Sequence, residues 1–203
     1  KSSGNTGRRC YFRVLFLALL SLTTMAFGPP ALRERDTAGL KFYPYQIREL
    51  AGNRPPTIEA KAFLLADFAT GTVLLAQNEH ERLPPASLTK IMTAILALEK
   101  SSLSDTVVVG KGATGMEPPA LGLLPGQKAS MENLLYGLLL ISANDAAAAI
   151  AEHIAGSQEA FVEMMNQKAA ELGMQNTHFA NPQGFDSEGH FSTAYDLWLL
   201  ARY

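Results

Sequence analysis

The chain has 203 residues, a formal net charge of −2 at neutral pH and a hydrophobic fraction of 47%. This length allows one medium-sized domain with a substantial core, and the balanced charge gives no sign of nucleic-acid binding. Cys10 is the only cysteine, so no disulfide can form within the chain. The four histidines lack metal-ligand spacing, and we interpret each as a surface or polar-core residue: His80, His153, His178 and His190.

Residues 1–27 have the pattern of an export signal. Basic residues precede a short apolar run at Val14–Leu22, and small residues at Thr24 and Ala26 offer a cleavage site. The apolar run is short for a membrane span. We therefore predict a signal peptide, or alternatively an uncleaved N-terminal anchor, and a protein exported to the periplasm or the outer face of the cytoplasmic membrane.

Residues 28–59 are predicted to be a linker, because they combine mixed charge and several prolines with no clear periodicity. We expect the folded domain to occupy residues 60–203. It opens with two apolar runs, Ala62–Asp67 and Val73–Ala76, on either side of Gly71. This pattern predicts a β-hairpin.

Residues 84–98 form the strongest local pattern in the chain. Two prolines end the preceding segment, and apolar residues then recur at helical spacing from Ile91 to Leu98. Ser87 and Lys90 are three positions apart, so both lie on one face near the start of the predicted helix.

This pair has the elements of a nucleophile and its base. A serine hydroxyl becomes a good nucleophile only when a neighbouring base accepts its proton. Lys90 can act as that base if burial lowers its pKa. The helix N-terminus also favours developing negative charge. Taken alone, however, the spacing is better explained by a serine cap followed by a surface lysine.

The remaining elements follow in chain order. A β-branched run predicts a strand at Thr106–Val109, and a second short strand is expected at Leu121–Gln127, ending in a Pro-Gly turn. Predicted helices then begin at a cap on Ser130, at Ala146, at a cap on Ser157, and near Ser192 or Thr193. The segment Asn176–Asp186 is expected to be an irregular loop.

Ser142-Ala143-Asn144 lies between two strongly apolar predicted helices. Polar side chains in such a place need partners. One explanation is local, with Asn144 or Asp145 capping the second helix. The other is a catalytic role, and the two roles are compatible.

Four blocks of sequence, taken together, resemble the low-molecular-mass penicillin-binding proteins, which are serine-type D-alanyl-D-alanine carboxypeptidases. The blocks occur in the order Pro85–Thr93, Ser142–Ala146, Leu172–Phe179 and Phe191–Leu197. The first two contain the Ser-x-x-Lys and Ser-x-Asn motifs of penicillin-recognising serine enzymes. The resemblance covers residues 60–203, and it favours the catalytic interpretation of Ser87.

The resemblance implies an α/β fold of the α+β type, with a helical lobe packed on an antiparallel sheet. It also implies the chemistry. Ser87 would attack the peptide bond between the two terminal D-alanines of a peptidoglycan stem peptide, and Lys90 would accept its proton. Ser142 would relay a proton to the leaving amine, and Asn144 would bind the substrate backbone and position Lys90.

Further expectations concern ligands and location. β-Lactam antibiotics would acylate Ser87. No metal or organic cofactor is implied, and neither is a nucleic-acid partner. Peripheral membrane association is possible in this family.

One feature of the family is absent from the printed sequence. The third motif, Lys-Thr-Gly or Lys-Ser-Gly on a strand beside the serine helix, does not occur. Because the chain stops inside a predicted helix at Tyr203, we expect a truncated chain with an incomplete sheet. Two alternatives remain: a β-lactamase with fast deacylation, and a non-catalytic peptidoglycan-binding protein or degenerate fragment.

Overall fold

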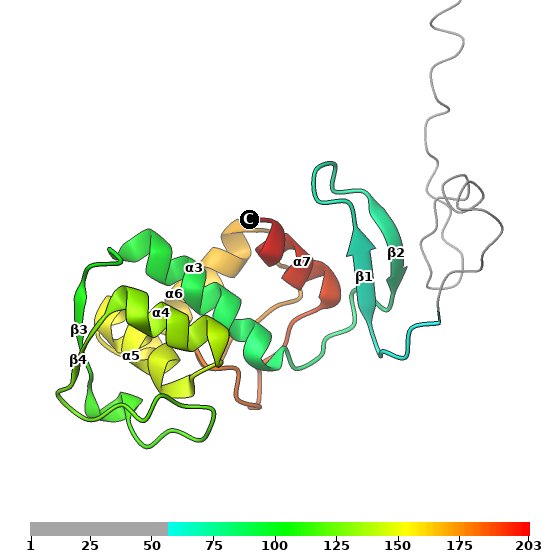
Figure 1. Ribbon diagram of the computed structural model, residues 1–203. Coiled ribbons are helices and arrows are strands. Elements are labelled where there is room, and N and C mark those ends of the chain that lie inside the picture. Colours follow the sequence, from blue (N-terminus) through cyan, green and yellow to red (C-terminus); the bar gives the residue numbers. More distant parts are fainter. Residues whose placement is uncertain (1–56) are drawn as a thin grey trace, which may run out of the picture. The chain divides into compact units, whose positions relative to one another are not determined.

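The computed structural model describes residues 57–203, which belong to the compact unit Asp36–Tyr203. The predicted signal peptide or anchor at 1–27 lies outside the described residues, as does nearly all of the predicted linker at 28–59. These domain boundaries therefore stay predictions. Within the described part, helices dominate and the strands are short (Figure 1).

The main elements occur in a simple order. The strands are β1 Phe63–Ala66, β2 Val73–Gln77, β3 Thr106–Val108 and β4 Lys128–Ser130. The helices are α3 Thr89–Lys100, α4 Met131–Leu140, α5 Asn144–Ala155, α6 Gln158–Glu171 and α7 Ala194–Arg202. Two 3₁₀ turns, Ala86–Leu88 and Lys111–Ala113, precede α3 and follow β3.

The predicted hairpin is confirmed. β1 pairs antiparallel with β2, and Leu64 lies opposite Ala76. Gly71 in the connection has a φ of +76°, a conformation that glycine adopts without steric cost. The Asp67 side chain accepts a 2.7 Å hydrogen bond from the Thr70 N–H, which tightens the turn.

The second sheet corrects one sequence prediction. β3 forms where expected, but it pairs with β4 at Lys128–Ser130, and Leu121–Gln127 forms no strand. The reason is that the Asp145 carboxylate accepts the Leu121 and Leu123 N–H groups at 2.9 and 3.0 Å. Backbone donors held by a side chain are not free to extend a strand ladder.

The helix starts follow the predicted capping residues at three of four places. The hydroxyls of Ser130, Ser157 and Thr193 each accept a backbone N–H from the first turn of α4, α6 and α7. The fourth prediction is wrong: α5 begins at Asn144 rather than Ala146, and Ala143 occupies the cap position. Neither Asn144 nor Asp145 is therefore the cap residue.

Two apolar clusters meet at the central helices. One consists mainly of buried side chains from α4, β3 and α5. The other consists mainly of buried side chains from α3, α6 and α7, packed around Phe161 and Phe179. Residues 144–151 of α5 are all buried, and their many alanines let neighbouring helices approach closely. Helix α3 packs against α4, α5, α6 and α7 (Figure 1).

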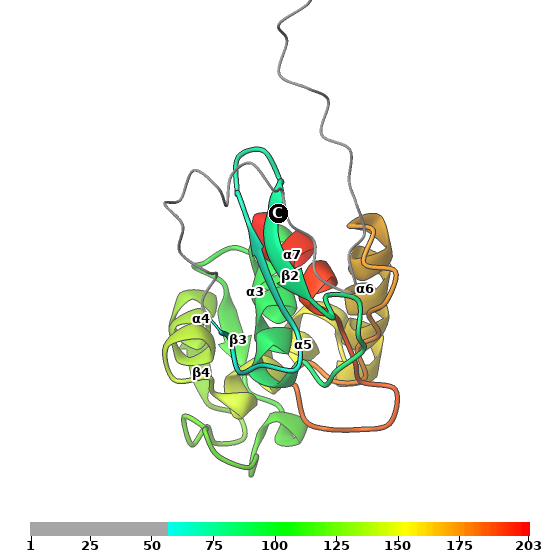
Figure 2. The same cartoon turned by 90° about the vertical axis from the view of Figure 1, so that its right-hand side faces the viewer.

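The segment between α6 and α7 returns to the N-terminal end of α3. In Figure 2 this orange-to-red segment runs below the helices, and its hydrogen bonds reach Thr89, Lys90 and Thr93 of α3. A long irregular segment thereby becomes one wall around the start of the buried helix.

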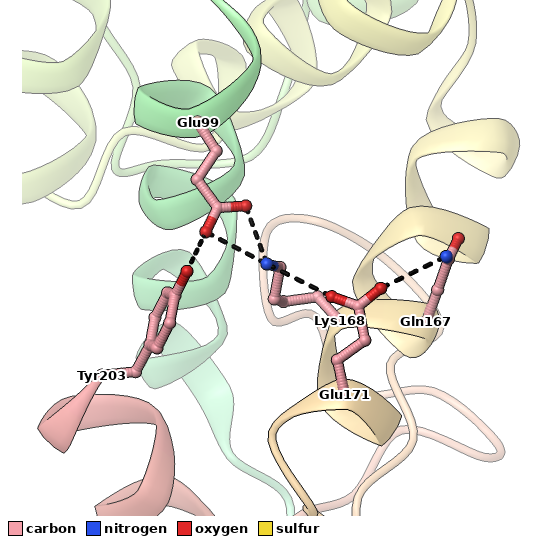
Figure 3. A network of polar contacts seen from close by, with 5 residues as sticks. All are labelled: Glu99, Gln167, Lys168, Glu171 and Tyr203. Atoms are coloured by element: carbon pink, nitrogen blue, oxygen red, sulfur yellow. Dashed lines mark hydrogen bonds and ion pairs between the residues drawn. The ribbon is translucent and has the colours of Figure 1, made fainter.

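The opposite end of α3 is joined to α6 and α7 by surface charges. Lys168 of α6 pairs with Glu99 of α3 at 2.9 Å and with Glu171 at 3.3 Å (Figure 3). Glu171 also accepts from Gln167, and the Tyr203 hydroxyl donates to Glu99 (Figure 3). We call these five residues the C-terminal network.

Candidate active site

Ser87 lies in the 3₁₀ turn that leads directly into α3. Its side chain is exposed at a groove of about 520 Å³, which is lined by Pro85, Ala86, Ser87, Leu88, Lys90, Ile91, Leu138, Leu139 and Ser142. The groove is mainly apolar. The residue before the serine, Ala86, has a φ of +48°, a strained backbone conformation of the kind that gathers at functional sites.

Lys90 lies beneath this serine. Its side chain is only 3% exposed, and its Nζ donates to Ser87 Oγ at 3.4 Å and to the Gln183 carbonyl at 2.7 Å. Burial lowers the pKa of Lys90, because the buried ammonium loses its hydration. The amine therefore becomes neutral at a lower pH than an exposed lysine would, and a neutral amine can accept the serine proton.

The Gln183 carbonyl was not predicted as part of the site. The segment that carries it is tied to α3 by a 2.8 Å hydrogen bond from Thr93 Oγ1 to the Pro182 carbonyl. A Cβ on Gly184 would lie 2.0 Å from the Ala86 carbonyl oxygen, so only glycine permits this close approach. The sequence identified an irregular loop here, but a backbone carbonyl acceptor leaves no side-chain signature.

Ser142 lines the same groove as Ser87 and Lys90. Its φ of +61° again lies in the left-handed region. Among residues 57–203, its Oγ is the buried side-chain oxygen or nitrogen that lacks a hydrogen-bond partner. A buried hydroxyl without a partner costs free energy, which is characteristic of a group reserved for a ligand.

Asn144 is buried in a different setting. Its Nδ2 donates to the Glu117 carbonyl at 2.8 Å, and its backbone N–H donates to the Pro119 carbonyl at 2.8 Å. It is not among the residues that line the groove. Asn144 therefore fixes the segment before Leu121, while its contact with substrate and with Lys90 stays a prediction.

The structure thus brings three of the four predicted site residues to one groove. Within residues 57–203, no group of three His, Asp or Glu side chains could hold a metal ion. In the same part of the chain, none of the helices combines the length and the apolarity needed to span a bilayer.

Comparisons with known proteins define the class of fold. A D-alanyl-D-alanine carboxypeptidase structure from Mycobacterium tuberculosis H37Rv superimposes with a TM-score of 0.70 at 39% identity, covering 75% of this chain and 58% of that one. Penicillin binding protein 6B from Escherichia coli gives a TM-score of 0.69 at 39% identity, with 75% and 51% covered. The fold is that of the penicillin-binding proteins, an α+β domain of which the described residues form an incomplete part.

Sequence comparison then gives the family. The sequence model of peptidase family S11, D-alanyl-D-alanine carboxypeptidase, matches residues 50–203. The carboxypeptidase DacF of Bacillus subtilis is 40% identical over 195 residues, which cover 94% of this chain and 47% of DacF. The chain belongs to this S11 family, and it spans about half the length of the curated relatives it matches.

Proposed function

We propose that the protein containing this chain is a serine-type D-alanyl-D-alanine carboxypeptidase, which removes the terminal D-alanine from peptidoglycan stem peptides. The observation that supports it most strongly is the contact of Ser87 with a buried lysine, at 3.4 Å and with a lowered pKa. Family membership and the groove over Ser87 agree with this chemistry.

The proposed reaction is acyl transfer in two steps. The Ser87 Oγ–H proton passes to the neutral amine of Lys90, and Oγ forms a bond to the carbonyl carbon of the penultimate D-alanine. The C–N bond then breaks, and the leaving D-alanine amine takes a proton relayed from Lys90 through Ser142. Water attacks the resulting ester, which releases the shortened peptide and returns the proton to Ser87.

Each predicted residue has a place in this scheme. Lys90 is held for proton transfer by the Gln183 carbonyl, which fixes the position of Nζ. The Oγ of Ser142, which is buried without a hydrogen-bond partner, would pass the proton to the leaving amine. Asn144 would hydrogen-bond the substrate backbone. The apolar groove fits the methyl groups of D-alanine and the ring system of a β-lactam, which would acylate Ser87.

The location and partners are part of the proposal. Stem peptides lie outside the cytoplasmic membrane, so the protein would be exported to the periplasm or the outer face of that membrane. Peripheral membrane association belongs to the same proposal.

The test uses the complete protein with a synthetic stem pentapeptide and a fluorescent penicillin. We expect D-alanine release, covalent labelling, and the loss of both in Ser87→Ala, because alanine has no nucleophile. Persistent labelling of the Ser87→Ala protein would contradict the assignment. Fast penicillin hydrolysis without D-alanine release would identify a β-lactamase, and peptide binding without either reaction would identify a non-catalytic binding protein.

A further inference from the structure

His190 is a buried histidine in the segment between α6 and α7, with 3% of its surface exposed. Its Nδ1 accepts a 2.9 Å hydrogen bond from the Ala180 N–H, and its Nε2 lies 2.9 Å from Thr89 Oγ1. Thr89 immediately precedes Lys90 on α3, and Ala180 belongs to the segment that carries the Gln183 carbonyl. The imidazole therefore joins the two pieces of chain that meet at Lys90 Nζ.

The hydrogen bonds fix the protonation state of the ring. A backbone N–H can only donate, so Nδ1 of His190 carries no proton. In the neutral imidazole the proton is then on Nε2, which donates to Thr89 Oγ1. A doubly protonated ring would bring Nδ1–H against the Ala180 N–H and break that bond.

We infer that His190 is a positioning residue for the Ser87–Lys90 pair: its neutral imidazole bridges α3 to the segment after α6 and so keeps the Gln183 carbonyl within reach of Lys90. The inference rests on the proposed acyl transfer at Ser87. His190 does not line the groove, so it acts through Lys90 rather than on the substrate.

The surroundings of the ring favour the neutral form. Burial lowers the pKa of His190, the neighbouring His178 lowers it further, and Asp186 opposes the shift. The bridge is thus complete at neutral pH and is lost as the pH falls through the lowered pKa of His190. The acylation rate should therefore fall on the acid side of its pH profile (its acid limb) in a step separate from the one caused by protonation of Lys90.

Two substitutions each preserve half of the bridge. His190→Asn keeps an acceptor near the position of Nδ1, and His190→Gln keeps a donor that reaches toward Thr89. Neither side chain titrates. We expect each variant of the complete protein to be acylated by a fluorescent penicillin about tenfold more slowly at neutral pH, since one hydrogen bond is lost. We also expect the rate to fall less steeply as the pH is lowered through the range in which the wild-type His190 gains its proton.

His178→Asn is the matched control, because it removes an imidazole from the same segment. His178 is exposed, and its Nδ1 contacts the Gly189 carbonyl at 2.6 Å rather than α3. We expect this variant to be acylated at the wild-type rate, with the acid limb moved slightly upward because a charge that lowers the pKa of His190 is gone.

A second measurement tests the bridge without turnover. Nitrogen-15 NMR of the histidine-labelled complete protein should show His190 as the neutral Nε2–H tautomer at neutral pH. Thr89→Val combined with His190→Asn should be non-additive by about fivefold in acylation rate, because both changes remove the contact between residue 190 and Thr89.

The outcomes are distinct. A wild-type protein that no penicillin acylates would refute the proposed function, while the NMR result would still report on the bridge. A reactive wild type whose His190 variants keep its acid limb unchanged would overturn the positioning role, even if those variants unfold at lower temperature. An Nδ1–H tautomer would overturn the bridge itself.

Discussion

The two ends of α3 place a lysine in opposite surroundings. At the N-terminal end Lys90 is buried, contacts a hydroxyl and a carbonyl, and has no carboxylate partner among residues 57–203. At the C-terminal end Lys168 approaches α3 from outside and pairs with two carboxylates (Figure 3). Burial lowers the pKa of Lys90, whereas the hydrogen bond to Glu99 raises that of Lys168.

The difference shows what turns an amine into a base. A lysine among carboxylates remains a cation and holds helices together, so it cannot accept a proton at physiological pH. A lysine without a counter-charge loses its proton more readily, because only dipoles replace its hydration. A lysine side chain is thus a surface contact at one end of α3 and, in the proposed mechanism, a proton acceptor at the other.

The largest expected effect comes from removing the amine at the N-terminal end. Lys90→Met keeps an unbranched side chain of similar length in the buried position but cannot accept a proton. We expect the rate of penicillin acylation of the complete protein to fall about 10²–10⁴-fold, the usual contribution of a general base. The melting temperature should change little, and an unchanged acylation rate would exclude Lys90 as the base.

The next effect tests the close packing around that amine. Gly184→Ala would place Cβ against the Ala86 carbonyl and force the segment away from Ser87. We expect a loss of about 2 kcal/mol in the free energy of unfolding and slower acylation, because the Gln183 carbonyl moves with Gly184. Both are measurable by chemical denaturation and penicillin labelling.

Gly173→Ala is the control for backbone strain alone. Gly173 has a φ of +76°, and a Cβ at this position would meet no atom within 4 Å, so the change costs about 1 kcal/mol without touching the groove. Equal acylation rates in the two alanine variants would show that the contact with Ala86 is irrelevant to reactivity.

Each end should also respond to pH through its own titratable group. Because the pKa of Lys90 is lowered, the acylation rate should rise as the pH rises through that value, and it should level off below the range of an exposed lysine. The Tyr203 hydroxyl and Lys168 lower the pKa of Glu99, so its stabilisation is present at neutral pH and is lost as the pH falls through the lowered value. Stopped-flow labelling and thermal unfolding across pH measure the two effects separately.

The smallest effect concerns the C-terminal network. In Lys168→Met we expect the melting temperature to fall by no more than about 3 °C, since exposed ion pairs contribute little. Added salt should shrink the difference from the wild type, because it screens exposed charges. The acylation rate should be unchanged, and a clear loss of rate would mean that this end of α3 also supports the site.

The sequence predicted those parts of the molecule that side chains specify locally. The hairpin, the caps at Ser130 and Ser157, and the Ser87–Lys90 spacing all follow from patterns within a few residues. The strand expected at Leu121–Gln127 failed because Asp145, distant in sequence, takes its backbone donors. The contacts of Gln183 and His190 with α3 were missed for the same reason, since they join segments far apart in the chain.

The strained backbone at Ser142 has a consequence for engineering. A glycine at this position would adopt the observed φ without cost and would bury no hydroxyl without a partner. Screens that reward heat resistance alone will therefore favour replacement of Ser142, and under the proposed mechanism the more stable proteins would lack the hydroxyl that passes a proton to the leaving amine. Stabilisation of this protein should keep residue 142 fixed and draw its gains from elsewhere in the fold.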